Sequence, residues 1–546
     1  MTHLGRAQEA PALTAQPART SAATRAKRAG LVVLATAVLF SCYCRQSQAV
    51  ALSSDGSGNI LQAWDMLHGN LLLHNWWVSD VSFYTTELPQ YMLIEALTGL
   101  GPWVVHAAAA MTYMLLVLLA ALLAMGNARG GRRLARALLA AGLMLAPQLS
   151  ATSILLLSPD HIGTAVPLLV TWLLIDRARP RWYVPVLVCL LFTLTMVADS
   201  IVLLTGVVPL TLVGAGRAFA GLIRRGGPRA SRWYELSLAG AAAVAGIAGS
   251  FAPRVMPALG GYQQSPVEAD TDLGQLQHGA WVTFQAFLEL FGANVFNTSF
   301  FGARPVFEVV FAALHLVGAI LAACALGVGI ARIFRFGELI VPVFAVAIVL
   351  NLGAYMSSMH AQDLLGAREM AEVLPLGAVL AGRVLGDPIA AWIRAAKAWL
   401  VPVLAVLAAG YLAALGYGAA QASVPAENEP LASWLVAHRL TDGLATYWQA
   451  NSTTVDSHGQ VRLSAVVQDV RDRLVPYLWE TDVANYDPAR HYADFVVADG
   501  PSALPGMQLS AELTFGHPAR TYHADGYTIL VWNTNLLDKL DGPGLK

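Results

Sequence analysis

Two acidic residues that could act as a general base stand in a polar and aromatic segment, residues 53–91. Asp55 lies in its opening Ser-Ser-Asp-Gly-Ser-Gly-Asn, and Glu87 lies in Thr-Thr-Glu-Leu-Pro near its end. A carboxylate can take the proton of a hydroxyl group that attacks an electrophilic centre. Since the flanking residues are largely apolar, this pattern indicates proton-transfer chemistry at a membrane surface.

Four more polar residues are candidates for binding a substrate. Asp160 and His161 follow Ser-Pro between two apolar runs, and His360 and Arg368 lie in a later polar stretch. Arg368 stands at the expected start of a helix, where a guanidinium group can contact a phosphate. We therefore predict Asp160, His161, His360 and Arg368 as substrate-binding residues.

Structural roles could explain the same residues without any chemistry. Asp55 stands in a Gly/Ser-rich sequence that favours a turn. Asp160 could cap the next helix through its side chain, and Arg368 could pair with neighbouring acids or with lipid phosphate. Asp199, at a short turn, is interpreted as a solvated acid. The sequence leaves these alternatives open.

The composition excludes an ordinary water-soluble protein. Of the 546 residues, 56% are hydrophobic and 13% are charged, whereas soluble domains contain about 25% charged residues. The net charge of −1 gives no overall field that would attract nucleic acid. The four cysteines lie in apolar runs and lack the spacing of a metal site. Most of the chain is therefore expected to face lipid.

Apolar runs recur along the chain, each near the roughly 20 residues that cross a bilayer. They predict about eleven spans, at residues 30–46, 102–125, 135–157, 162–176, 183–198, 201–219, 235–253, 305–331, 338–356, 371–385 and 398–416. Basic residues gather in every second connection, namely Arg129, Arg132, Arg133 and Arg136; Arg177, Arg179 and Arg181; Arg217, Arg224, Arg225 and Arg229; Arg332 and Arg335; and Arg383, Arg394 and Lys397. The positive-inside rule then places the N-terminus in the cytoplasm and the acids named above on the outer face.

These patterns divide the chain into three parts. Residues 1–28 form a disordered cytoplasmic tail, 29–417 a membrane domain with an outer loop at 48–100, and 418–546 an extracytoplasmic soluble domain. The first apolar run is interpreted as an uncleaved span rather than a signal peptide, because the residues after it match a cleavage site poorly. A second long outer loop is expected at 254–304.

Local patterns add elements outside the spans. Residues 59–68 carry apolar side chains at helical spacing, which predicts an amphipathic helix lying along the membrane interface just after Asp55. A helix over 431–439 and strands over 461–467, 494–497 and 527–532 are expected in the last part. The predicted fold is an all-α polytopic membrane protein with a small α+β C-terminal domain.

This arrangement resembles the GT-C membrane glycosyltransferases, which include protein mannosyltransferases and aminoarabinose transferases of lipid A. The likeness covers the plan of spans and three short matches, Ser54-Asp55-Gly56 through Ala63, Gly69-Asn70 and Leu88-Pro89-Gln90-Tyr91. Many relatives carry a second acid where this chain has Gly56. Because of this difference, the sequence leaves open whether the site around Asp55 binds a divalent cation.

The resemblance implies an enzyme of the bacterial plasma membrane. Its donor would be a sugar on a polyprenyl phosphate, and its acceptor an envelope glycan, lipid or protein. By resemblance Asp55 is the general base, and a single displacement would invert the anomeric centre. Arg368 is then expected to contact the leaving phosphate, because developing charge needs a cation.

Two other classes of protein have a similar composition. A transporter or flippase for an envelope lipid or sugar would need polar groups along a path through its spans. A non-catalytic assembly or sensor protein would bind a partner through its outer domain. A cavity containing Asp55 on the outer face would argue against the second class.

Overall fold

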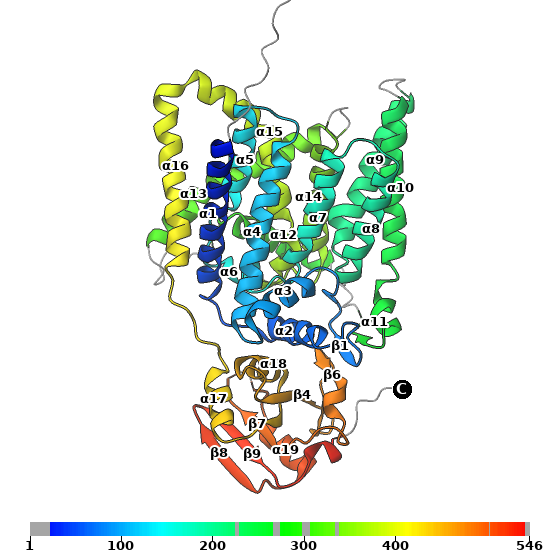
Figure 1. Cartoon of the computed structure of the whole chain (residues 1–546), viewed down its shortest axis with the longest axis vertical. Coiled ribbons are helices and arrows are strands. Elements are labelled where there is room, and N and C mark those ends of the chain that lie inside the picture. The colour runs from blue at the N-terminus through cyan, green and yellow to red at the C-terminus, as the bar shows by residue number, and fades with distance from the viewer. Residues whose placement is uncertain are drawn as a thin grey trace, which may run out of the picture.

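The computed structural model describes residues 22–223, 229–265, 273–296, 306–333, 338–501 and 503–540. The chain forms a mostly helical body with a smaller domain of mixed helix and sheet at one end (Figure 1). The predicted tail lies outside the described residues as far as residue 21, and its last part belongs to α1 (Ala22–Ser47). Arg224, Arg225, Arg335 and parts of the expected loop 254–304 also lie outside the described residues.

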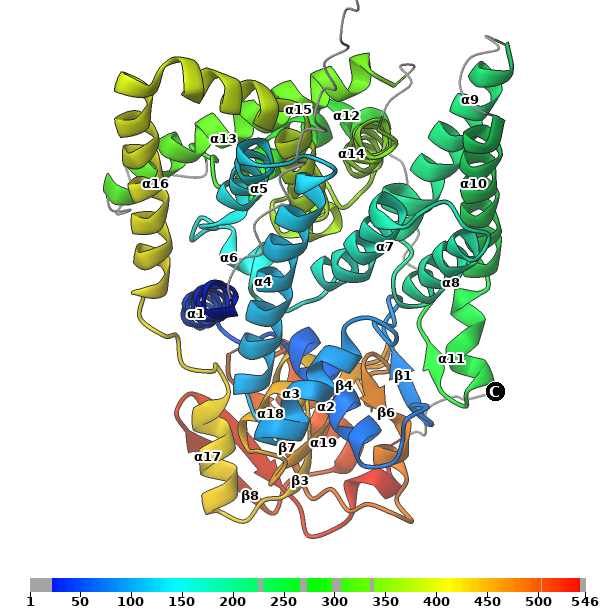
Figure 2. The same cartoon turned by 45° about the horizontal axis from the view of Figure 1, so that its top comes forward.

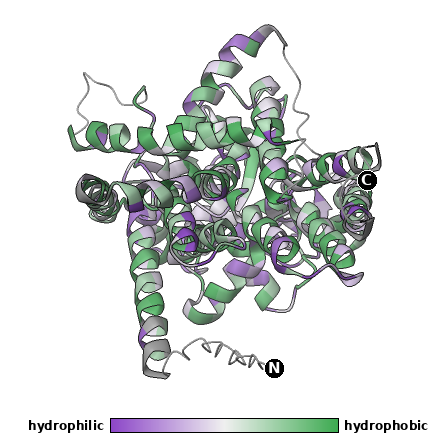
Figure 3. Ribbon diagram, turned by 90° about the horizontal axis from the view of Figure 1, so that it is seen from above, coloured by the Kyte–Doolittle hydropathy of each residue, from purple (hydrophilic) through white to green (hydrophobic). Residues whose placement is uncertain are grey.

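Within the described ranges, eight helices are long and apolar enough to cross a membrane. They are α1, α4 (Trp103–Met125), α9 (Val208–Ile223) with the π-turn η2 (Leu203–Val207) before it, α10 (Arg229–Gly249), α13 (Val306–Ala331), α14 (Ile340–Ser357), α15 (Val373–Ala395) and α16 (Lys397–Ala419). Hydrophobic residues dominate these helices along their lengths (Figure 3). Large apolar side chains such as Val406 and Leu412 on α16 point outward, as expected for a lipid-facing surface.

Three other predicted spans are shorter helices, and the expected loop 254–304 contains two helices that were not predicted. The three shorter spans are α5 (Gly131–Met144), α7 (Ala165–Arg177) and α8 (Tyr183–Ala198). The predicted span 135–157 ends early and continues only as the short α6 (Thr152–Leu155), because Pro147 cannot extend a helix. The expected loop 254–304 contains α11 (Val255–Ala258) and the apolar helix α12 (Leu276–Leu290).

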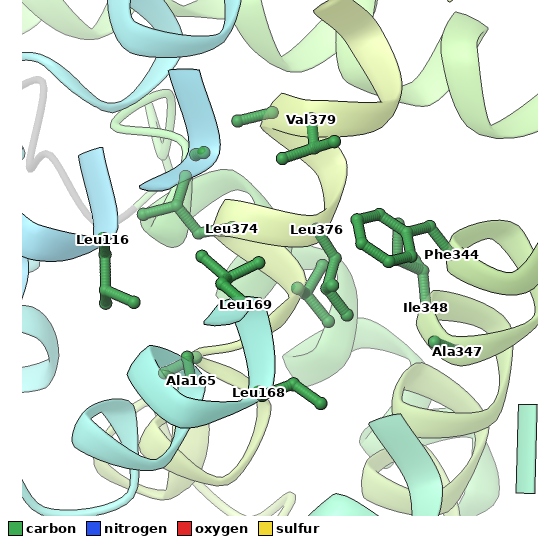
Figure 4. Close-up of a cluster of buried hydrophobic side chains, with 14 of the residues drawn as sticks. Leu116, Ala165, Leu168, Leu169, Phe344, Ala347, Ile348, Leu374, Leu376 and Val379 are labelled. Atoms are coloured by element: carbon green, nitrogen blue, oxygen red, sulfur yellow. The ribbon is translucent and has the colours of Figure 1, made fainter. Parts of the chain in front are cut away.

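The buried core of the helical body is centred on α15. This helix packs against α4, α5, α13 and α14, while α8, α9 and α10 form a neighbouring group beside α7 (Figure 2). In the close-up of Figure 4, Leu116 of α4, Leu169 of α7, Leu376 of α15 and Phe344 of α14 belong to one buried cluster, in which Leu376 lies beside Phe344. Each of these four side chains is buried, so dispersion contacts hold the helices together.

A network of ion pairs ties the helices at the end remote from the C-terminal domain. The Arg383 guanidinium on α15 lies 2.6 Å from Asp176 and 3.0 Å from Glu338, and it also donates to the Leu123 carbonyl. Arg136 on α5 makes a two-pronged contact with Asp387. The Arg383 side chain is only 1% exposed, so its partners depend on it for their charge balance.

Arg383→Met is therefore expected to destabilise the protein by about 3–5 kcal/mol, because it removes the 2.6 Å partner of the buried Asp176 carboxylate and leaves only the 3.4 Å contact with Arg177. The measurement is thermal unfolding of the purified protein in detergent. The control is Arg394→Ala, at an exposed position of the same helix, which should change stability by less than about 0.5 kcal/mol. Equal unfolding temperatures for Arg383→Met and the wild type would contradict the structural role of this network.

The first polar segment forms a layer between the helical body and the C-terminal domain (Figure 1). It contains α2 (Ser54–Leu67), β1 (Trp76–Val78) and α3 (Leu88–Thr98). The predicted helix over 59–68 is thus present but begins five residues earlier. One side of α2 packs against α3 and the other against α18 of the C-terminal domain. The helix is therefore covered by protein rather than lying free along an interface.

A small sheet connects this layer to the C-terminal domain. Its order is β2-β1-β6, where β2 is Tyr262–Gln263 and β6 is Thr481–Asp482. Strand β1 runs parallel to β2 and antiparallel to β6. Backbone hydrogen bonds thus join segments that are about 400 residues apart in the sequence and fix the residues just before β6 beside the first polar segment.

The C-terminal domain contains a six-stranded sheet in the order β5-β4-β3-β7-β9-β8. The strands are β3 (Asp442–Ala445), β4 (Arg462–Gln468), β5 (Leu474–Pro476), β7 (Phe495–Asp499), β8 (Arg520–Ala524) and β9 (Tyr527–Val531), with helices α17 (Glu429–Ala437), α18 (Tyr447–Asp456) and α19 (Met507–Phe515). Strand β3 is parallel to β4 and β7, and the other pairs are antiparallel. The predicted helix over 431–439 and the three predicted strands correspond to α17, β4, β7 and β9, so these predictions are confirmed.

Candidate functional site

A cavity of about 750 Å³ lies where the helical body, the first polar segment and the C-terminal domain meet. Five of the six predicted site residues line it, namely Asp55, Asp160, His161, His360 and Arg368. These residues come from α2, the connection before α7, and the segment between α14 and α15. The fold therefore gathers residues that lie as much as 313 positions apart in the sequence, between Asp55 and Arg368.

Asp55 lies in the first turn of α2 rather than in a turn ahead of the helix, as the sequence suggested. The reason is Ser53, whose side chain accepts a hydrogen bond from the Gly56 amide and starts the helix there. Asp55 Oδ2 is 3.8 Å from Arg368 Nη1, and Asp55 Oδ1 accepts a 2.6 Å hydrogen bond from Tyr447. A carboxylate at a helix N-terminus is also favoured by the helix dipole.

The two glycines after Asp55 are required by close packing. A side chain at Gly56 would meet Val105 at 3.1 Å and Ser158 at 3.6 Å, and one at Gly58 would meet the Glu480 carboxylate at 2.3 Å. Both glycines are in helical backbone, so lack of space rather than backbone conformation explains them. A side chain at position 56, where many GT-C enzymes carry a second acid, would be tightly packed here.

Asp160 is buried and does not cap a helix. Its carboxylate accepts hydrogen bonds from Asn59 at 2.9 Å and Ser158 at 2.6 Å, and the helices that follow have no side-chain cap. Burial raises the pKa of Asp160, although the Ser158 hydrogen bond opposes this effect. Through Asn59, Asp160 also fixes α2 against the connection that leads into α7.

His161 is held between two carboxylates in the cavity wall. Its Nδ1 lies 3.0 Å from Asp199 and its Nε2 lies 3.3 Å from Glu369. Burial lowers the pKa of His161, but the two carboxylates together outweigh this effect and keep the pKa well above its ordinary value. Its backbone has φ +61°, a strained conformation for a residue other than glycine. The site therefore contains a fixed imidazolium as well as the Arg368 guanidinium, and Asp199 is a buried partner rather than a solvated acid.

Glu87 is the predicted site residue that does not line the cavity. It is fully buried, accepts hydrogen bonds from Thr86 and Thr164, and packs against Gly163, where a side chain would meet it at 2.6 Å. Burial raises its pKa from an ordinary value of 4.5 to about 8. Glu87 thus lies behind the cavity wall and supports the connection that carries His161.

Glu87→Gln is expected to reduce the pH dependence of stability. Between pH 4.5 and about 8 the folded protein keeps a proton on Glu87 that the unfolded chain releases, so stability falls as the pH rises through this window. Thermal unfolding measured across the window should show a smaller fall for Glu87→Gln than for the wild type. The exposed Asp499→Asn serves as control and should keep the wild-type slope. An unchanged slope in Glu87→Gln would show that this carboxyl does not hold the proton.

Another part of the cavity wall is apolar. It is formed by α8, the π-turn η2, α10 and the residues that follow α10, with Met196, Leu203, Leu204, Gly246 and Gly249 among the lining residues. The charged wall and this wall face the same space. The cavity can thus hold a ligand that has both a charged and a hydrocarbon part.

Sequence reasoning did not identify the site residues of the C-terminal domain. Glu480 lines the cavity beside Trp479, and Tyr447 joins Glu480 to Asp55. No spacing in the sequence links these residues to Asp55, because the link depends on the pairing of β1 with β6.

In the described part of the chain, no group of three or more His, Cys, Asp or Glu side chains could hold a metal ion. At Asp55 both carboxylate oxygens already have partners, and the next residue is Gly56, which has no side chain to bind a cation. The described residues around Asp55 therefore do not fit a divalent cation. No family model matches the chain, and no curated protein matches it either.

Proposed function

We propose that the protein is a membrane glycosyltransferase of the GT-C type. It transfers a sugar from a polyprenyl-phosphate donor to an envelope glycan, lipid or protein on the outer face of the bacterial plasma membrane. The observation that carries this proposal is the pairing of Asp55 with Arg368 in a cavity whose wall is partly apolar. A base, a phosphate contact and a hydrocarbon surface are the three features that this reaction requires.

In the proposed reaction, Asp55 takes the proton of the acceptor hydroxyl as its oxygen attacks the anomeric carbon of the sugar. The bond between that carbon and the phosphate oxygen breaks, and its electron pair leaves with the polyprenyl phosphate. Arg368, helped by the His161 imidazolium, stabilises the charge that develops on this phosphate. Attack opposite the leaving group inverts the anomeric centre.

The apolar wall supports a lipid-linked donor. Aliphatic side chains of η2 and glycines of α10 line the same cavity as the charged residues. An isoprenoid chain would bury hydrocarbon there, at about 25 cal/mol for each Å² removed from water. A soluble nucleotide-sugar has no hydrocarbon chain and would gain no binding free energy from this wall. The cavity therefore favours a donor that enters from the bilayer.

The proposal includes a topology of eleven spans, in which α5, α7 and α8 cross together with the eight longer helices. The arginine-bearing connections α4–α5 and α15–α16 lie at the end remote from the C-terminal domain (Figure 1). The positive-inside rule then gives a cytoplasmic N-terminus and an extracytoplasmic C-terminal domain. The cavity would open at the outer headgroup level, where lipid-linked donor and acceptor meet.

The test is sugar transfer by the purified chain in liposomes. A panel of polyprenyl-phosphate sugars, each labelled in the sugar, is offered together with an envelope extract as acceptor. Transfer of label from at least one carrier to extract material, with inversion of the anomeric configuration, is the expected result. Movement of intact labelled carrier across the bilayer without transfer would instead identify a flippase and overturn the proposal.

A further inference from the structure

Two side chains of the C-terminal domain, Tyr447 and Glu480, connect to Asp55. Tyr447 Oη lies 2.6 Å from Asp55 Oδ1 and 2.9 Å from Glu480 Oε2. Tyr447 is 8% exposed and Glu480 is 2% exposed. A phenol has one hydrogen to donate, so two ionised carboxylates could not both be satisfied by it. One of the two carboxyl groups must therefore be neutral and donate to the phenol oxygen.

The surroundings identify Glu480 as the neutral group. Asp55 has the Arg368 guanidinium within 3.8 Å and is 27% exposed, so its charge is compensated. No arginine or lysine forms an ion pair with Glu480 among the residues that the structure describes. Burial raises the pKa of Glu480 well above its ordinary value, and Asp55 and Asp160 raise it further.

We propose that Glu480 and Tyr447 are positioning residues for Asp55. The neutral Glu480 carboxyl donates its hydrogen to Tyr447 Oη, and the Tyr447 hydroxyl donates to Asp55 Oδ1. This chain occupies Oδ1, so the acceptor proton goes to Oδ2, which lies 3.8 Å from Arg368 Nη1, beyond hydrogen-bond distance. The catalytic role of these hydrogen bonds rests on the proposed function. The direction in which each hydrogen bond is donated does not.

The fold holds both positioning residues rigidly. Glu480 directly precedes β6, which pairs with β1, and its carboxylate occupies the space left by Gly58 on α2. Tyr447 is the first residue of α18, and its carbonyl accepts a 2.8 Å hydrogen bond from Ser54, the neighbour of Asp55. The C-terminal domain is thus built into the site rather than attached beside it.

The charged groups around Asp55 determine how Asp55 responds when the Tyr447 hydroxyl is removed. The charged and titratable groups that face it from the packed elements are Arg368, Asp160, Glu480, Tyr447 and Tyr477. Only Arg368 among them carries positive charge. Loss of the Tyr447 hydrogen bond disfavours ionised Asp55, so the acid limb of a pH–rate profile should move to higher pH.

The first measurement compares Tyr447→Phe, Glu480→Gln and Glu480→Leu in the liposome assay. Tyr447→Phe and Glu480→Leu should lower kcat about 10- to 100-fold, as expected for a hydrogen bond to a charged group. The KM for the donor should stay unchanged, and the acid limb should move upward. Glu480→Gln should keep most activity, because its amide N–H can donate to Tyr447 as the neutral carboxyl does. Tyr522→Phe, on the remote strand β8, is the control that should behave as wild type.

An unchanged kcat and pH profile in Tyr447→Phe would overturn the proposal. Equal losses in Glu480→Gln and Glu480→Leu would also overturn it, because a neutral donor would then not suffice. Unfolding temperatures of the variants show whether any loss of activity reflects misfolding.

The second measurement needs no activity. Infrared spectra of the purified protein at neutral pH should contain a carboxylic acid C=O band that disappears in Glu480→Gln and shifts in Tyr447→Phe. Absence of that difference would overturn the neutral state of Glu480. If the infrared result holds while the wild type transfers no sugar, the proposed function fails and the hydrogen-bond chain stands.

Discussion

Asp55→Asn is expected to lower kcat for sugar transfer by about 10²–10⁴-fold, the contribution of a general base. The amide cannot take a proton from the acceptor hydroxyl, yet its oxygen can still accept the hydrogen bond from Tyr447. The fold and the binding of donor should therefore be preserved. The measurement is the rate of label transfer at saturating donor, with the KM for the donor determined in parallel.

The control for this variant is Asp499→Asn, the same substitution at an exposed position of the C-terminal domain. It should leave kcat within twofold of the wild type. Full sugar transfer by Asp55→Asn would show that Asp55 is not the base. A lower unfolding temperature for Asp55→Asn, with that of Asp499→Asn unchanged, would indicate a structural role for Asp55. A large fall in kcat at an unchanged unfolding temperature supports the assignment.

Arg368→Ala is expected to lower kcat/KM by about 10²–10³-fold, as found when a group that stabilises developing charge is removed. The leaving phosphate loses its guanidinium contact, and Asp55 loses the cation 3.8 Å away. Arg368→Lys should recover only part of the loss, because lysine keeps the charge but not the planar, two-pronged geometry. Donor titrations in the liposome assay separate the effects on KM and kcat.

Arg520→Ala provides the matched control, since Arg520 is an exposed arginine of β8 far from the cavity in the sequence and the fold. Its kinetics should equal those of the wild type. Unchanged kcat and KM in Arg368→Ala would exclude a phosphate contact at this residue. A rise in donor KM together with the fall in kcat would show that Arg368 acts in binding as well as in the transition state.

The predicted elements were accurate where local pattern decides structure. Apolar runs gave helices, and segments rich in β-branched and aromatic residues between turn residues gave strands such as β4 and β9. The errors came from local signals that compete with hydropathy. Pro147 ended the predicted span 135–157, and Ser53 started α2 ahead of its apolar stripe, which moved Asp55 from a turn into a helix.

The candidate site was predictable only in part. Composition and topology singled out Asp55, Asp160, His161, His360 and Arg368, and the fold places them in one cavity. Glu87 is also an acidic residue in a polar connection, as Asp55 and Asp160 are, yet it lies behind the cavity wall. The packing of its neighbours, Thr164 and Gly163, decides which way such a carboxylate points, and a sequence does not encode that direction locally.

By itself the sequence determined that the chain has lipid-compatible helices, a small α+β domain and acids in its polar connections. Hydropathy and residue type suffice for these statements, because burial of apolar surface is a property of each segment. Only the tertiary structure decided that Glu480 and Tyr447 reach Asp55, that Asp199 and Glu369 hold His161, and that Gly56 packs closely against Val105. These contacts join residues that are between 33 and 392 positions apart, so they depend on strand pairing and close packing that no local pattern contains.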